Sequence, residues 1–240
     1  MTKPLVVITG ASSGFGKATA KALSAKGHAL LLIARRLERL EAMNLPDTMC
    51  AKIDVTDRTA LVQAIAKAEE RFGPVDCIVN NAGVMYLGQA HEQDPEEWKK
   101  MVEVNILGVL NGIHAVLPEM KKRKHGTIIN IGSIAGRKSF SNHAAYCGTK
   151  FAVHALSETI REEVAPDNVR VIVIAPGAAE TELLNHTTSD TIKEGYNQWK
   201  EQMGGVMNAQ DVANSIVFAY EQPQEVCIRE IVLAPTRQEP

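Results

Sequence analysis

The feature that most limits the fold of this chain is the alternation of short, continuously apolar runs with longer amphipathic stretches. A strand that is apolar along its whole length is buried on both faces, which is typical of a parallel sheet covered by helices. We therefore predict an α/β fold with a seven-stranded, doubly wound parallel sheet and helices on both faces. The predicted strands are Leu5–Thr9, Ala29–Ala34, Met49–Ile53, Val75–Asn80, Thr127–Ile131, Val169–Ala175 and Val226–Leu233. The predicted helices include Gly16–Lys26, Arg58–Arg71, Pro95–Lys122, Ala144–Val164, Thr191–Gln202 and Asp211–Tyr220.

The domain organisation follows from the same alternation of predicted strands and helices. No linker, repeat or low-complexity stretch interrupts the sequence, so residues 1–240 are predicted to form a single domain. About thirty residues separate the strand Val169–Ala175 from the helix Asp211–Tyr220. An insertion after the carboxyl end of a strand is often a lid, and we expect a substrate lid at about 182–208. The alternative is a surface excursion with no function.

Composition narrows the classes of function. The formal net charge of −2 argues against nucleic acid or a membrane surface as the main partner. The four cysteines form no CxxC pair and the histidines form no HExxH motif, so we expect no bound metal. The start of the chain lacks the pattern of a signal peptide, and the longest uninterrupted apolar run, Ala29–Ala34, is far shorter than a membrane span. These observations together predict a cytoplasmic protein whose main partner is neither nucleic acid nor a membrane surface.

A glycine-rich turn follows the first predicted strand. The segment Thr9–Gly16 has the spacing TGxxxGxG and leads into a helix. Glycines at such a turn permit a tight bend, close approach to a pyrophosphate and close packing of helix and strand. The free N–H groups of the helix start then favour a phosphate. A P-loop is excluded because Lys17 comes one residue too late and Ala18 follows it; a purely structural turn stays open as the alternative.

Two arginines at the end of the second strand bear on the choice of cofactor. A site for NAD places an acidic residue there to bind the ribose 2′-hydroxyl. This chain instead has Ala34, Arg35 and Arg36. Because a guanidinium pairs well with phosphate, the sequence predicts NADP(H), with Arg35 on the 2′-phosphate and Arg36 beside it. The alternative is that both arginines belong to a solvated helix start.

A second group of polar residues predicts acid–base chemistry. Tyr146 and Lys150 are four residues apart in a predicted helix, so their side chains share one face. A nearby ammonium group lowers the pKa of a phenol, which would make Tyr146 a better proton donor near neutral pH. Ser133 follows the strand Thr127–Ile131 and is therefore predicted at the ligand-binding edge of the sheet.

These motifs, taken in order, resemble the short-chain dehydrogenase/reductase family. The matching features are TGxxxGxG, the segment Asn80–Gly83, Asn105, Ser133, the YxxxK pair and Pro176-Gly177, and they cover nearly the whole chain. The resemblance implies a single-domain Rossmann fold, an NADP(H)-dependent oxidoreductase of carbonyl or alcohol substrates, and a homotetramer or homodimer built on the helices Pro95–Lys122 and Ala144–Val164. The alternative function is a non-catalytic NADP(H)-sensing protein, but such members tend to lose the Tyr or Lys of the YxxxK pair.

The resemblance also implies roles for single residues. Tyr146 would be the general acid/base, Lys150 would hold the nicotinamide ribose, Ser133 would bind the substrate carbonyl and Asn105 would hold a water in a proton relay. The implied cofactor-binding residues are Gly10, Ser12, Ser13, Phe15, Gly16, Arg35, Arg36, Asp54, Val55, Asn81, Ala82, Gly83, Tyr146, Lys150, Pro176, Gly177, Ala179 and Thr181. Residues considered for the substrate pocket are Met85, Tyr86, Phe140, His143, Tyr196 and Trp199. Segments such as Ser133–Arg137 and Thr181–His186 resemble the clavulanate dehydrogenase group within the family.

Overall fold

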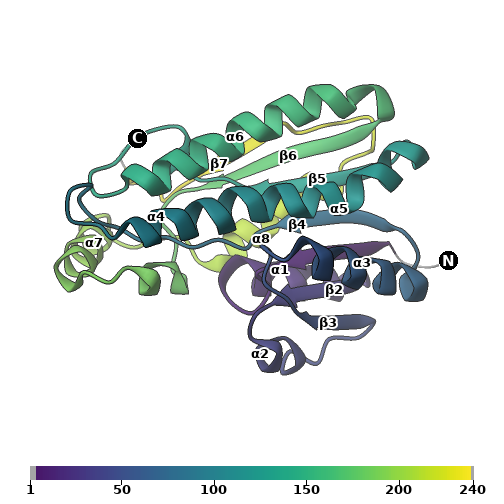
Figure 1. The fold of residues 1–240 in the computed structure, drawn as a ribbon, viewed down its shortest axis with the longest axis horizontal. Helices are drawn as coiled ribbons and strands as arrows, with labels where there is room; N and C mark the ends of the chain where they lie inside the picture. Colours follow the sequence, from purple (N-terminus) through teal and green to yellow (C-terminus); the bar gives the residue numbers. More distant parts are fainter. Residues whose placement is uncertain (1–3, 239–240) are drawn as a thin grey trace.

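A seven-stranded sheet forms the centre of the computed structural model, which describes residues 4–238 (Figure 1). The strand order is β3-β2-β1-β4-β5-β6-β7 and every neighbouring pair is parallel. The predicted fold class is therefore confirmed. The strands are β1 (Leu5–Thr9), β2 (Ala29–Ala34), β3 (Thr48–Lys52), β4 (Val75–Asn80), β5 (Gly126–Ile131), β6 (Val169–Pro176) and β7 (Glu230–Leu233).

Helices cover both faces of the sheet. The larger ones are α1 (Gly14–Ala25), α3 (Arg58–Phe72), α4 (Pro95–Val102), α5 (Gly108–Arg123), α6 (Ala144–Val164), α7 (Asp190–Gln202) and α8 (Ala209–Tyr220), with a short α2 (Leu37–Glu41) after β2. Apolar side chains of α3, α5 and α6 pack on one face, and those of α1 and α8 pack on the other (Figure 1). The inner strands β1, β2, β4, β5 and β6 are almost wholly buried, as their continuous apolar sequences require, whereas the edge strands β3 and β7 are partly exposed.

Side-chain caps explain why several helices begin where they do. Asp57 accepts a hydrogen bond from the Ala60 N–H at the start of α3. Asn208 and Asp211 form a capping box at the start of α8, in which each side chain accepts from the backbone N–H of the other residue. Such caps satisfy N–H groups that the first turn of a helix leaves without partners.

The helix predicted over Pro95–Lys122 is interrupted in the structure. Residues Glu103–Leu107 form a π-helical turn between α4 and α5. The whole stretch Pro95–Arg123 is long and apolar enough, by length and composition, to cross a membrane. In this fold it lies along the sheet, where Ile113, Val116 and Met120 of α5 join the core.

The edge strands also differ from the prediction. The seventh strand was expected over Val226–Leu233, but only Glu230–Leu233 pairs with β6. The expected strand starts in a turn, in which the Val226 N–H donates to the Pro223 carbonyl, and pairing begins four residues later at Glu230. The third strand is shifted by one residue, from Met49–Ile53 to Thr48–Lys52.

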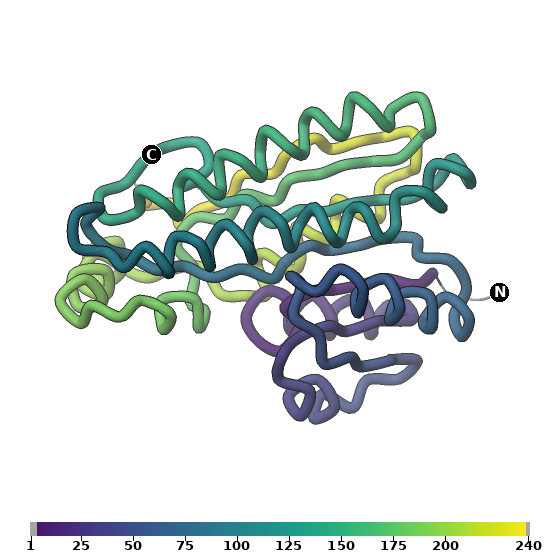
Figure 2. The backbone as a smooth tube through the Cα atoms, in the orientation of Figure 1, coloured from purple at the N-terminus to yellow at the C-terminus, as the bar shows by residue number. Residues whose placement is uncertain are grey.

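Parallel pairing brings the carboxyl ends of all the strands to one edge of the sheet. The chain leaves β1 toward β2 on one side and returns to β4 on the other, so the strand order reverses between β1 and β4 (Figure 2). Ligands of open α/β sheets bind at such a reversal. The site is therefore expected where β1, β4 and β5 end.

Candidate active site

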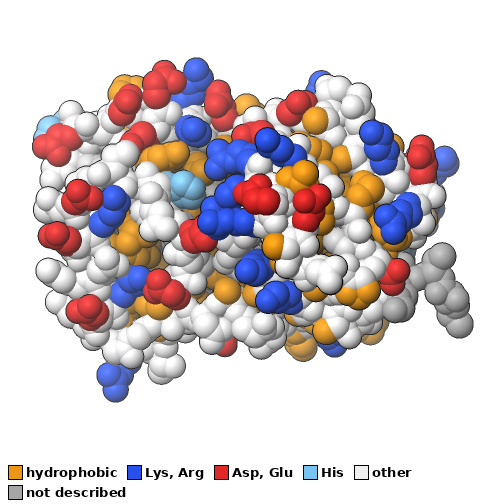
Figure 3. Space-filling model, turned by 90° about the horizontal axis from the view of Figure 1, so that it is seen from below, with side chains coloured by type: hydrophobic (Ala, Val, Ile, Leu, Met, Phe, Trp, Pro, Cys, Tyr) orange, Lys and Arg blue, Asp and Glu red, His pale blue; other side chains and the backbone are white. Residues whose placement is uncertain are grey.

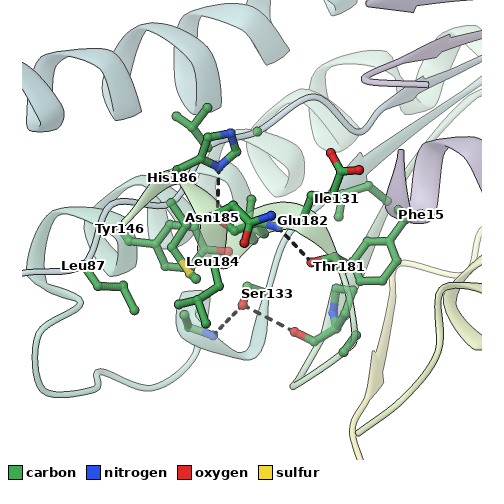
Figure 4. A pocket seen from close by; sticks show the side chains of 18 of the residues that line it. Phe15, Leu87, Ile131, Ser133, Tyr146, Thr181, Glu182, Leu184, Asn185 and His186 are labelled. Atoms are coloured by element: carbon green, nitrogen blue, oxygen red, sulfur yellow. Dashed lines mark hydrogen bonds between the residues drawn. The ribbon is translucent and has the colours of Figure 1, made fainter. Parts of the chain in front are cut away.

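A cleft of about 1030 Å³ opens at the carboxyl edge of the sheet. The glycine-rich turn and the arginines after β2 line one end, and Ser133, Tyr146 and residues of α7 line the other. Figure 4 shows Phe15 and Thr181 on one side of this space, Tyr146 and Leu87 on the other, and Ser133 between them. The cleft is larger than a single metabolite needs and reaches the upper range of small-molecule sites.

The glycine-rich turn lies tightly against the end of β4. The Asn81 side-chain amide donates to the carbonyls of Thr9 and Gly10, at 2.9 and 3.2 Å. A Cβ at Gly10 would lie 2.8 Å from this amide nitrogen, and one at Gly16 would lie 2.5 Å from it. Gly10 also has a φ of +65°, which L side chains rarely adopt. Gly16 does not line the cleft. Its lack of a side chain instead lets the start of α1 pack closely against the glycine-rich turn and the Asn81 side chain.

The arginines after β2 form a small polar network. Nη2 of Arg36 donates to the hydroxyls of Ser12 and Ser13, each at 3.2 Å. Nη1 of Arg36 donates to Glu182 at 2.9 Å, and Arg39 donates to the same carboxylate at 2.8 Å. Arg35 lines the cleft and is exposed. Figure 3 shows Lys and Arg side chains gathered near the middle of one face of the molecule, with Asp and Glu side chains among them. The sequence placed Arg35 first on a phosphate, whereas the structure fixes Arg36 in place.

Tyr146, Lys150 and Ser133 meet at the other end of the cleft. Tyr146 and Lys150 lie one turn apart on α6 and are 6% and 8% exposed. The Lys150 ammonium donates to the Ile131 carbonyl at 2.8 Å and lies 5.8 Å from the centroid of the Tyr146 ring. The Ser133 hydroxyl accepts from the Ala135 N–H and donates to the Pro176 carbonyl. All three side chains line the cleft, as the sequence predicted.

Burial dominates the electrostatics at this end of the cleft. It raises the pKa of Tyr146 well above its usual value, and a side-chain hydrogen bond with Ser133 is the main opposing influence. Burial also lowers the pKa of Lys150 to about 8. Desolvation of the phenol is therefore the largest influence on the pKa of Tyr146 in this structure, and the expected lowering of that pKa by Lys150 stays a prediction.

Asn105 lies behind the wall of the cleft, in the π-helical turn between α4 and α5. Its side-chain oxygen accepts from the Val84 N–H at 2.9 Å, and its amide donates to the Val84 carbonyl at 2.9 Å and to the Thr149 hydroxyl at 3.1 Å. At 1% exposure, Asn105 braces the loop after β4 against the start of α6. The water-holding role implied by the family resemblance stays a prediction.

The remaining predicted cofactor-binding residues also lie along the cleft. The lining includes Asp54, Val55, Asn81, Ala82, Gly83, Pro176, Gly177, Ala179 and Thr181. The Asp54 carboxylate accepts from the N–H and the hydroxyl of Thr56, which fixes its orientation after β3. These residues lie at or after the ends of three different strands, β3, β4 and β6, and the parallel topology explains why they face one space.

Aromatic rings enclose the end of the cleft beyond Tyr146. The ring of His143 lies 6.3 Å from Tyr146 and 6.3 Å from Tyr196, and Tyr196 lies 5.3 Å from Trp199. Met85, Phe140, His143, Tyr196 and Trp199 line the cleft, while Tyr86 packs behind it against His186. Burial lowers the pKa of His143, which favours its neutral form. This end of the cleft is suited to a partly apolar ligand.

Two further residues of the cleft carried no signal in the sequence. Glu182 follows Thr181 directly but belongs to no motif, and only the fold brings it to Arg36 and Arg39. Gln238 reaches the cleft from the end of the chain, where its side-chain oxygen accepts from the Ala178 N–H at 2.8 Å. Sixty positions separate Ala178 from Gln238, so no local sequence pattern could have predicted their contact. No cluster of His, Cys, Asp or Glu suited to a metal ion occurs within residues 4–238.

Comparison with known proteins agrees with this geometry. The family model described as short chain dehydrogenase matches residues 4–192. An uncharacterized oxidoreductase of Staphylococcus saprophyticus is 39% identical over 240 residues, which cover 98% of this chain and 96% of the relative. The chain belongs to the short-chain dehydrogenase/reductase family, a family of oxidoreductases.

Solved structures show the same fold with bound nucleotides. The closed form of a serine dehydrogenase complexed with NADP+ has a TM-score of 0.91 and 30% identity, with 98% of this chain and 96% of that chain covered. An alcohol dehydrogenase from the archaeon Thermococcus sibiricus, complexed with 5-hydroxy-NADP, has a TM-score of 0.86 and 30% identity, with 99% of each chain covered.

The buried ammonium of Lys150 leads to a prediction about stability. Its pKa of about 8 lies below the ordinary value of about 10.4 that it regains on unfolding. Between these pH values the unfolded chain binds more protons, so the penalty for burying the charge is full below pH 8 and is relieved as the pH rises. Relative to Lys150→Met, the free energy of unfolding of the wild type should therefore rise by roughly 1–3 kcal/mol from pH 7 to pH 10.

Urea unfolding of both proteins at several pH values measures this difference. Lys21→Met, which removes a lysine from the exposed side of α1, is the control. A difference between wild type and Lys150→Met that stays flat or falls with pH would contradict the prediction.

Proposed function

We propose that the protein is an NADP(H)-dependent reductase of aldehydes or ketones, or a dehydrogenase of the corresponding alcohols. One observation carries this proposal: a polar group suited to a phosphate lies at one end of the cleft, and a buried Ser–Tyr–Lys group lies at the other. The bound nucleotide in the similar structures supports the same cofactor.

The residues of the cleft fit this cofactor. A carboxylate already lies on Arg36, which shows that this position accepts an anion. Ser12, Ser13, Arg35 and Arg36 would hold the 2′-phosphate, while Asp54 and Val55 would border the adenine. The loop Asn81–Gly83 would border the middle of the cofactor, and Pro176, Gly177, Ala179 and Thr181 would border its nicotinamide end. The bound cofactor would supply or accept the hydride.

The side chains near Ser133 would handle the substrate oxygen. A carbonyl oxygen placed between the hydroxyls of Ser133 and Tyr146 would accept a hydrogen bond from each, which polarises the carbonyl. Tyr146 would pass its proton to the oxygen during reduction and take it back during oxidation. The raised pKa of Tyr146 favours the protonated phenol that reduction requires. The charged Lys150 nearby would stabilise the phenolate that remains.

The aromatic end of the cleft supports a substrate with an apolar part next to its carbonyl. Tyr196 and Trp199 come from α7, within the segment predicted as a lid. We propose that this segment closes over the substrate. The resemblance to the clavulanate dehydrogenase group rests on segments such as Ser133–Arg137 and Thr181–His186, and it stays a prediction about the subfamily.

The experiment that tests the proposed function is a screen of NADPH consumption over aldehydes, ketones and oxo acids. We expect turnover with at least one class and lower activity when NADH replaces NADPH. Tight NADPH binding without turnover of any class would favour the NADP(H)-sensing alternative instead.

Tyr146→Phe tests the acid–base assignment. The change keeps the ring and removes the transferable proton, so we expect kcat to fall by about 10²–10⁴-fold with little change in the Kd of NADPH. Tyr196→Phe is the matched control, because it removes a phenol hydroxyl from the same cleft. Fluorescence titration gives the Kd, and near-normal turnover by Tyr146→Phe would refute the assignment.

Arg36→Ala tests the phosphate site. A charge-assisted hydrogen bond is worth roughly 1.5–3 kcal/mol, so its loss should weaken NADPH binding by about 10–100-fold. Binding of NADH should change little, because NADH has no 2′-phosphate. Arg35→Ala provides the comparison, and a larger effect there would return the assignment to the residue that the sequence favoured.

We also propose that the protein is a homotetramer. Two separate surfaces expose large apolar side chains: Val102, Leu107 and Phe151 on the α4–α6 side, and Phe218, Val226 and Val232 near α8 and β7. Two different self-complementary interfaces fit a tetramer of D₂ symmetry, whereas a dimer needs one.

Phe151→Glu should therefore halve the molecular mass in solution. The substitution places a charge at a residue that is 45% exposed in the single chain and would be buried against its own copy. Light scattering measures the mass. An unchanged mass would show that this side of the molecule is not an interface.

A further inference from the structure

The Glu182 carboxylate is bound as a ligand would be at the phosphate end of the cleft. One of its oxygens lies 2.9 Å from Nη1 of Arg36, and the other lies 2.8 Å from Nη1 of Arg39. Bonds to the two guanidinium groups are the main reason that the pKa of Glu182 is lowered. An anion is therefore held at this position by two cations from the region after β2.

The same Arg36 contacts the hydroxyls of Ser12 and Ser13 in the glycine-rich turn. Its guanidinium thus joins three parts of the chain: the turn after β1, the end of β2 and the segment after β6. Glu182 and a 2′-phosphate would need the same donors. A phosphate carries more negative charge than a carboxylate and would repel it at this distance.

We propose that Glu182 is a cofactor-specificity residue, an internal anion that competes with the 2′-phosphate of NADP(H) for Arg36 and Arg39 and is displaced when the phosphate binds. This inference rests on the proposed use of NADP(H). The three side chains are 41–45% exposed, so the ion pairs are weak enough to exchange. NADH would leave the Glu182 contacts in place.

Displacement of Glu182 would reach the substrate end of the cleft. Glu182 begins the short 3₁₀ helix Glu182–His186, whose side chains Leu183, Leu184, Asn185 and His186 line the cleft (Figure 4). The next residue, Thr187, is buried, and its hydroxyl accepts from the Leu87 N–H at 3.2 Å. The 3₁₀ helix is therefore held at its start by the arginines and just after its end by Thr187. When Glu182 leaves the arginines, the change in backbone position should be confined to residues 182–186.

The opposite role is physically possible and predicts the opposite sign. A carboxylate can hold two arginines in the orientation that a phosphate needs. If Glu182 acts in that way, removing its charge will weaken NADPH binding. If Glu182 instead competes with the 2′-phosphate, removing its charge will strengthen NADPH binding.

Glu182→Gln separates these roles because it keeps the shape of the side chain and removes its charge. We expect the Kd of NADPH to fall by about 3–10-fold, since two exposed ion pairs no longer need to be broken. The Kd of NADH should stay within twofold of the wild type. Glu180→Gln is the matched control. It removes an equal charge two residues before Glu182, from a carboxylate that pairs with Lys200 at 3.0 Å. This change should leave the Kd of NADPH and the Kd of NADH unchanged.

Fluorescence titration with NADPH and NADH measures both dissociation constants for each variant and for the wild type. Weaker or unchanged NADPH binding by Glu182→Gln, in a wild type that prefers NADPH, overturns the inference and leaves the proposed function standing. A wild type that shows no preference for NADPH contradicts the proposed cofactor itself. An equal gain with Glu180→Gln would show a general charge effect and would also overturn the inference.

Hydrogen exchange of the wild type gives a test that needs no variant. NADPH should increase exchange at the amides of the 3₁₀ helix Glu182–His186 relative to NADH, because only NADPH releases Glu182. Equal exchange with the two cofactors would overturn the proposed displacement.

Discussion

Parallel pairing of the strands is the constraint on which the rest of this structure depends. It sends every strand toward the same edge of the sheet and requires a helix to return the chain each time. The Thr9–Gly16 turn, the arginines, Asn81, Ser133 and Pro176 consequently follow the ends of five different strands and face one cleft. Since each group is fixed by its own strand, the site is assembled by the sheet.

The two ends of the cleft use charge in different ways. At the phosphate end the arginines and Glu182 are nearly half exposed, so their ion pairs are screened by water and exchange readily. At the Ser133 end, Tyr146 and Lys150 are more than nine-tenths buried, so desolvation governs both pKa values. An exchangeable site suits a cofactor that must enter and leave, while a buried one suits proton transfer to a fixed oxygen.

Local sequence patterns were sufficient to predict the fold class, and the family resemblance implied most of the residues that line the cleft. Continuous apolar strands gave the parallel sheet, and the spacing of the YxxxK pair gave the shared helix face of Tyr146 and Lys150. The features that the sequence did not reveal depend on tertiary contacts. Burial is the largest influence on the pKa of Tyr146, and spacing does not reveal burial. The place of Glu182 on Arg36 joins residues 146 positions apart, beyond the reach of any local pattern. The position of Gln238 in the cleft could not be predicted for the same reason.

The side chain of Asn105 has a consequence for the loop after β4. Its amide gives one donor and one acceptor to the carbonyl and N–H of a single residue, Val84. A peptide group of a neighbouring strand would offer the same N–H donor and carbonyl acceptor. The Asn105 carboxamide thus takes the place of one peptide group of a strand beside Val84. The loop that borders the middle of the cleft is thereby fixed at Val84, beyond the last paired residue of β4. A carboxylate has no donor and an aliphatic side chain has neither group, so a carboxamide is the side chain whose hydrogen-bonding groups match a peptide unit here.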